Sequence, residues 1–116
     1  MEMEKSSWTI EEYVTARGEN LVLVFLSRQS GKVKAEAIAL LKLLKERGYL
    51  LGMPHSRALG EGLFELRGTQ VRIFYMFRPG RRITLLDGML KKQDRIPARV
   101  LGRLRRFQRE VAAIQG

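Results

Sequence analysis

Apolar residues recur at helical spacing in two long segments of the chain. In residues 32–47 the spacings are 4, 3, 1 and 3, which give one apolar stripe: Val33, Ala37, Leu40, Leu41 and Leu44. Gly48 follows, a residue type that commonly ends helices. After Pro97 the spacings are 4, 3, 4 and 3: Val100, Leu104, Phe107, Val111 and Ile114. Both segments are predicted to be amphipathic helices, the second opened by Pro97, whose missing N–H costs nothing there.

The N-terminal part of the chain predicts a strand followed by a short helix. Residues 8–15 combine Trp8, Ile10 and Tyr13 with β-branched neighbours, which is typical of a strand. Residues 21–28 are short and very apolar, so periodicity alone fits either a buried strand or a buried helical turn. We expect a helix, because Asn20 can cap it and residues 27–31 can stop it.

Residues 63–90 predict an antiparallel meander of three strands, over residues 63–67, 71–77 and 83–90. In the middle strand four apolar side chains share one face: Val71, Ile73, Tyr75 and Phe77. Pro79 and Gly80 stand in the order that a type II turn prefers. The last strand is nearly continuously apolar, as a central strand would be. Residues 49–62, rich in glycine and proline, are predicted to be a connector.

These elements predict one α+β domain over residues 1–116. The expected sheet is small, antiparallel and twisted, and consists of the N-terminal strand and the meander. Two helices follow the first strand, a basic helix ends the chain, and the helices are expected against one face. A turn centred on Pro79 and Gly80 would place Arg72 directly opposite Asp87.

The charge balance narrows the class of partner. Lysine and arginine number 22 and aspartate and glutamate 12, so the net charge is +10. A small protein of this charge is expected to meet a polyanion: a nucleic acid, an acidic protein or an anionic membrane surface. The alternative is that the charge serves solubility alone. A membrane-surface role is disfavoured, because neither long helix pairs a basic face with exposed tryptophan or phenylalanine.

Several function classes find no support in the composition. Cysteine is absent and His55 is the single histidine, which excludes disulfides, thiolate metal sites and multi-histidine clusters. We therefore expect no cofactor and no metal. No apolar run approaches the roughly 20 residues of a membrane span. The start of the chain, MEMEKSSW, is acidic and polar and predicts no signal peptide, so a cytoplasmic location is expected.

Five motifs in order resemble a known family. They are Trp8-Thr9 in the first strand, FELR at residues 64–67, VRIFY at 71–75, ITLLDGMLKKQDRIP at 83–97 and the arginine-rich last helix. In order and spacing, from Trp8 to about Arg109, the chain is similar to the phage-derived HigB branch of the RelE/ParE toxin superfamily. The family usually has histidine where this chain has Asp87, and phenylalanine where it has Met89.

The resemblance implies the toxin of a type II toxin–antitoxin system. Such a toxin binds in the ribosomal A site and cuts mRNA until a helix-turn-helix antitoxin of the HigA kind wraps it into a hetero-oligomer. The positions that match the family motifs are Arg67, Arg72, Lys91 and Lys92. If the family histidine transfers protons, Asp87 must replace it here or activity is impaired.

Metal-independent RNA cleavage uses the 2′-hydroxyl of the substrate, and needs a base, an acid and cations around the phosphate. The catalytic candidates are Arg67, Arg72, Lys92, Asp87 and His55. The candidates for RNA binding are Lys91, Arg95, Arg99, Arg103 and Arg106. Arginine offers a planar fork to phosphate and lysine a mobile point charge, while histidine is the natural acid or base near neutral pH.

Each candidate also has a structural interpretation. Arg72 could form a salt bridge with Asp87 that seals the sheet. Arg67 could pair with neighbours of Glu65 or with a helix carboxylate. His55 could be an ordinary loop residue, and the lysines and helix arginines could be solvated. Two other functions share the pattern: a ParE-like inhibitor of DNA gyrase that acts by binding, and a non-catalytic phage-derived nucleic-acid-binding module.

Overall fold

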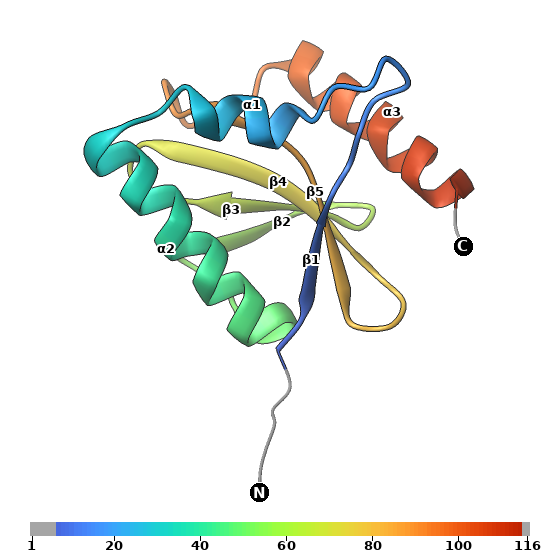
Figure 1. Cartoon of the computed structure of the whole chain (residues 1–116), viewed down its shortest axis with the longest axis horizontal. Helices are drawn as coiled ribbons and strands as arrows, with labels where there is room; N and C mark the ends of the chain where they lie inside the picture. Colours follow the sequence, from blue (N-terminus) through green and yellow to red (C-terminus); the bar gives the residue numbers. More distant parts are fainter. Residues whose placement is uncertain (1–6, 115–116) are drawn as a thin grey trace, which may run out of the picture.

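Within residues 7–114, five strands and three α-helices form the fold, which confirms the predicted α+β class (Figure 1). The computed structural model describes residues 7–114. In chain order the elements are β1 (Thr9–Glu12), α1 (Leu21–Ser27), α2 (Gly31–Arg47), the 3-10 turn η1 (Gly48–Leu50), β2 (Ser56–Gly60), β3 (Leu63–Arg67), β4 (Val71–Arg78), β5 (Arg82–Leu90) and α3 (Ala98–Ile114). None of these helices has the length and apolar content needed to cross a membrane.

The sheet is mixed rather than antiparallel throughout. Its strand order is β1-β5-β4-β3-β2, with β1 parallel to β5 and the other neighbours antiparallel. The prediction missed β2, which lies in the segment expected to be a connector. Its sequence, SRALG, contains no β-branched or aromatic residue. It becomes a strand by pairing with β3 at the edge of the sheet.

Helices cover both faces of the sheet, so the prediction that they share one face was wrong. The alternation along β4 separates the two cores. Val71, Ile73 and Tyr75 pack with buried residues of α1 and α2. Phe74, from the same strand, packs with the buried stripe of α3. The central strands are therefore buried on both sides, as the apolar run of β5 predicted.

The predicted helix ends are largely confirmed. The Asn20 side chain accepts a hydrogen bond from Leu23 N at 3.0 Å, which caps α1. Gly48 ends α2 with φ of 50°, and a β-carbon there would lie 2.0 Å from the Trp8 ring, so both conformation and space require glycine. The Pro97 carbonyl begins α3 by accepting from Val100 N and Leu101 N. Ile114, expected in the apolar stripe, is 74% exposed.

Two local features shift the register between β4 and β5. The connection contains three residues, Pro79 to Arg81, and Arg78 pairs with Arg82. A bulge between Phe74 and Tyr75 then displaces the far half of the ladder. Asp87 consequently pairs with Phe74 and Arg72 with Met89, so the predicted pairing of Arg72 with Asp87 was wrong.

Glu36 of α2 holds the turn between β3 and β4. Its carboxylate accepts hydrogen bonds from Thr69 N and Thr69 Oγ1 at 2.7 Å and from Gln70 N at 3.0 Å. Burial alone would raise the pKa of Glu36, but these bonds outweigh burial and hold the pKa below its usual value. Gly68 gives the carboxylate room, because a β-carbon there would lie 2.5 Å from Glu36 Cδ.

Replacing Glu36 by glutamine should destabilise the protein by about 1 kcal/mol at neutral pH. The amide accepts from the turn through one neutral oxygen, and its NH2 group cannot accept from the N–H that the second carboxylate oxygen bound. The lowered folded-state pKa means that this contribution is present above the unfolded pKa and is lost as pH falls through the folded pKa. Urea unfolding at pH 7 and pH 3 measures it: the difference from wild type should shrink at pH 3. Glu46→Gln, at an exposed position on the same helix, is the control. An equal difference in unfolding free energy at both pH values would contradict the stabilisation of the β3–β4 turn by the Glu36 carboxylate.

Candidate functional site

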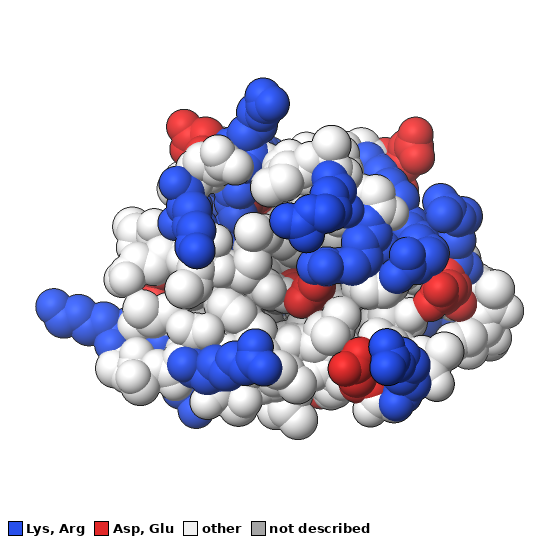
Figure 2. Space-filling view, turned by 90° about the horizontal axis from the view of Figure 1, so that it is seen from above, with Lys and Arg blue, Asp and Glu red and all other residues white. Residues whose placement is uncertain are grey.

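A cleft of about 900 Å³ opens between α1, the loop 91–97 and α3. Eight basic side chains from five different segments line it: Arg17, Arg28, Arg72, Lys92, Arg95, Arg99, Arg103 and Arg106. Figure 2 looks down on this side of the molecule, where Lys and Arg side chains border a hollow that holds an acidic group. The cleft is therefore a concentrated site of positive charge.

The walls of the cleft differ in character. On the α3 side Arg99, Arg103 and Arg106 recur at spacings of 4 and 3 residues, so they share one helical face. On the α1 side apolar side chains contribute to the lining, among them Leu21, Val24 and Phe25. One wall can thus meet phosphate oxygens while the other meets the faces of bases or sugars.

Asp87 is the buried carboxylate of the cleft. Its Oδ2 accepts from Arg103 Nη2 at 2.9 Å and its Oδ1 accepts from Gly88 N at 2.7 Å. Burial raises the pKa of Asp87 above its usual value, and Gly88 N–H and Arg103 oppose this without cancelling it. Its ion-pair partner is thus a helix arginine, not the predicted Arg72.

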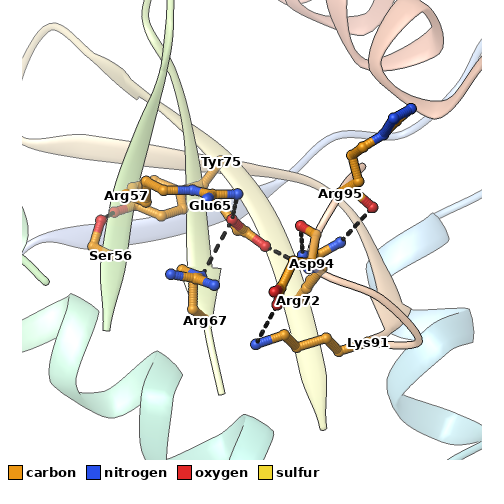
Figure 3. Close-up of polar contacts among 9 residues, drawn as sticks. All are labelled: Ser56, Arg57, Glu65, Arg67, Arg72, Tyr75, Lys91, Asp94 and Arg95. Carbon is orange, nitrogen blue, oxygen red and sulfur yellow. Dashed lines mark hydrogen bonds and ion pairs between the residues drawn. The ribbon is translucent and has the colours of Figure 1, made fainter. Parts of the chain in front are cut away.

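Glu65 gathers three arginines on neighbouring strands (Figure 3). Its oxygens lie 2.6 Å from Arg72 Nε, 2.9 Å from Arg57 Nη2 and 3.5 Å from Arg67 Nε. Glu65 is fully buried and Arg72 is 1% exposed. One negative charge against three positive ones leaves a fixed excess of positive charge on this part of the sheet.

The remaining contacts of Arg72 reach the loop 91–97. Its Nη1 donates to the Arg95 carbonyl at 3.3 Å and its Nη2 donates to the Asp94 carbonyl. The guanidinium is therefore engaged by Glu65 and by the loop. Arg72 positions the loop that carries Lys92 and Arg95 to the rim of the cleft.

The structure divides the predicted site residues into two groups. Those that line the cleft are Arg72, Asp87, Lys92, Arg95, Arg99, Arg103 and Arg106. Arg67, His55 and Lys91 line a smaller groove beside α2. Lys91 and Lys92 are adjacent in sequence but line different pockets. The predicted acid–base candidates Asp87 and His55 are therefore not brought together.

Sequence reasoning missed several residues of this region. Arg17 and Arg28 flank α1 and line the cleft, while Arg57 lies on the strand β2 that was not predicted. Tyr13 also lines the cleft, and its hydroxyl donates to Glu110 Oε1 of α3. Burial and this bond raise the pKa of Tyr13 to about 12, so it stays protonated near neutral pH. Counting the charges of each segment could have identified these arginines. The contact of Tyr13 with Glu110 joins residues far apart in the sequence, so only the folded structure reveals it.

Comparison with known proteins places the chain in a family. The model of the family described as "Phage derived protein Gp49-like (DUF891)" matches residues 24–107, which include α2, the whole meander and most of α3. The chain belongs to this Gp49-like family. No curated protein matches the chain.

One similar solved structure is a chain in the toxin–antitoxin complex RelBE2 from Mycobacterium tuberculosis. The similarity has a TM-score of 0.55 at 12% sequence identity and covers 74% of this chain and 100% of that chain. The Gp49-like protein therefore shares its fold with a member of a toxin–antitoxin complex.

Arg72→Ala should lower the free energy of unfolding by about 3 kcal/mol, because it leaves Glu65 buried with weaker partners and releases the loop carbonyls. The substitution Lys92→Ala, at an exposed position, should leave the free energy of unfolding nearly unchanged. Urea denaturation of both variants measures this. Equal stabilities would mean that the Arg72 contacts do not hold the loop.

Proposed function

We propose that this Gp49-like protein is the HigB-like toxin of a type II toxin–antitoxin system and cleaves mRNA on the ribosome. The observation that carries the proposal is the basic cleft with one buried carboxylate of raised pKa, Asp87, at hydrogen-bond distance from Arg103. Family membership and a fold shared with a chain of a toxin–antitoxin complex support the same class. The implied partner is a helix-turn-helix antitoxin of the HigA kind.

The proposed reaction needs no external nucleophile. The Asp87 carboxylate takes the proton of a ribose 2′-hydroxyl, and the 2′-oxygen attacks the adjacent phosphorus. The bond from phosphorus to the 5′-oxygen breaks, and that oxygen takes a proton, for which Lys92 is the candidate donor. The products are a 2′,3′-cyclic phosphate and a 5′-hydroxyl.

The arginines supply the electrostatic part of the proposal. The crowded phosphate gains negative charge as it reacts, and donors fixed in advance around it are generally the largest catalytic contribution. Arg99, Arg103 and Arg106 share one face of α3, so an RNA backbone in the cleft can meet all three. Their contribution to binding should weaken with salt.

The direct test is mapping of mRNA 5′ ends in translating cells that express the protein. New ends clustered at codon positions are expected with wild type and with Glu46→Gln. Asp87→Asn should reduce them at least about 100-fold, because the amide cannot act as a base. Growth arrest with intact mRNA and accumulating DNA breaks would favour gyrase inhibition instead. Normal growth with intact mRNA and intact DNA would contradict the proposal and favour a non-catalytic nucleic-acid-binding module.

The pH profile of cleavage should have an acidic limb set by Asp87. The base must be ionised, so the rate falls as pH drops through the pKa of Asp87, which burial raises. Arg103 lowers this pKa, so Arg103→Ala should move the limb to higher pH. Arg106→Ala removes a cleft arginine that does not bond Asp87 and should leave the midpoint in place. Single-turnover rates on ribosome-bound mRNA give both midpoints; a limb unmoved by Arg103→Ala would remove Asp87 from the role of base.

A further inference from the structure

A second groove, of about 460 Å³, lies beside α2 and shares no lining residue with the cleft. Its floor is apolar and includes Ala39, Leu40 and Leu43 of α2. Its rim carries two cations and a histidine: Arg67 ends β3, Lys91 follows β5 and His55 precedes β2. Four separate segments thus combine an apolar floor with three basic groups.

The basic groups of the rim are held loosely. Arg67 Nε lies 3.5 Å from Glu65 Oε1, which is also 2.9 Å from Arg57. Lys91 Nζ lies 3.9 Å from Asp94, whose side chain is 95% exposed. The Lys91–Asp94 pair is long and Asp94 is exposed, so it contributes little and exchanges readily. Arg67 is largely buried beside Glu65, but that one carboxylate faces three guanidinium groups, so Arg67 keeps positive charge. Arg67 and Lys91 can therefore attract a carboxylate that enters the groove.

The acid that lines the groove does not oppose such a ligand strongly. Glu36 is engaged by Thr69 and Gln70 of the β3–β4 turn, as described above. Its charge is thereby shared with the N–H groups of the turn. The rim keeps a positive balance around an apolar floor.

We propose that this groove docks an acidic segment of the protein partner. An aliphatic side chain of that segment packs on Ala39 and Leu43, and its carboxylates meet Arg67 and Lys91. The identity of the partner as an antitoxin rests on the proposed function; the chemistry of the docked segment does not. RNA fits the groove less well, because Glu36, whose pKa is held below its usual value, places a carboxylate in the lining that a phosphate would meet.

The position of the groove gives this docking a consequence for the cleft. Lys91 lines the groove and the adjacent Lys92 lines the cleft, on the loop that Arg72 anchors. A segment bound to Lys91 therefore reaches the boundary of the cleft without filling it. The partner gains a hold on the protein that is independent of the RNA site.

The test is an NMR titration of the labelled full chain with the peptide acetyl-LEELLEDL-amide. Amide shifts should change around α2, Arg67 and Lys91. Ala39→Glu, which places a negative charge on the floor, should weaken binding at least about tenfold, or 1.4 kcal/mol. Ala39→Lys adds similar bulk with the opposite charge and should bind better than Ala39→Glu. Ala35→Glu, exposed one turn away and outside the groove, should bind like wild type.

The same spectra report folding, so an unfolded variant is recognised and Ala39→Lys then carries the comparison. A decauridine titration should shift the cleft residues of α3 and leave the groove residues of α2 unchanged. The proposal is overturned if the peptide shifts the cleft residues of α3, if it binds nowhere, if Ala39→Glu binds as wild type does, or if decauridine shifts the groove residues of α2. None of these outcomes depends on RNA cleavage, so a failure of the proposed function remains distinguishable.

Discussion

The buried ion pair between Glu65 and Arg72 is the interaction on which the functional side of the molecule depends. Each charge alone would be costly to bury, and together they are stable because both are held on paired strands, 2.6 Å apart. Arg72 also binds the Asp94 and Arg95 carbonyls, so one guanidinium connects the sheet to the loop 91–97. That loop separates the cleft from the groove and presents a lysine to each.

Around this pair, two carboxylates of the sheet offset part of the positive charge of the neighbouring arginines. Glu65 neutralises part of the charge of Arg57, Arg67 and Arg72. Asp87 forms an ion pair with Arg103 of α3. The proposed chemistry depends on the balance at Asp87, where burial raises the pKa and Arg103 limits the rise. A carboxylate in this setting can take a proton near neutral pH more readily than an exposed one.

The sequence predicted the parts of the fold that local patterns determine. The Asn20 cap, the stripe of α3 and the alternation along β4 all follow from spacing within one element. Strand β2 was missed because its residues favour no strand without β3 beside them. The hydrophobic pattern of residues 8–15 carries no information on strand direction, so the parallel pairing of β1 with β5 could not be predicted from it.

The site was predicted less completely, because it depends on register. A connection of three residues in place of two, together with one bulge, moved Asp87 away from Arg72 and towards α3. Of the residues that match the family motifs, Arg72 and Lys92 line the cleft, but the motifs gave no sign that Lys91 and Arg67 line a separate groove. The arginines of the α1 region escaped notice because they lie in short loops outside the motifs.

The central claim is that the cleft supports attack by a ribose 2′-hydroxyl. It is tested most directly with purified ribosomes carrying an mRNA that has a single 2′-deoxynucleotide at the mapped cleavage position. The account predicts that the unmodified mRNA is cut, leaving a 2′,3′-cyclic phosphate and a 5′-hydroxyl, and that the deoxy-substituted mRNA stays intact. Cleavage of the deoxy-substituted mRNA at the same position, or an intact unmodified mRNA, would contradict it.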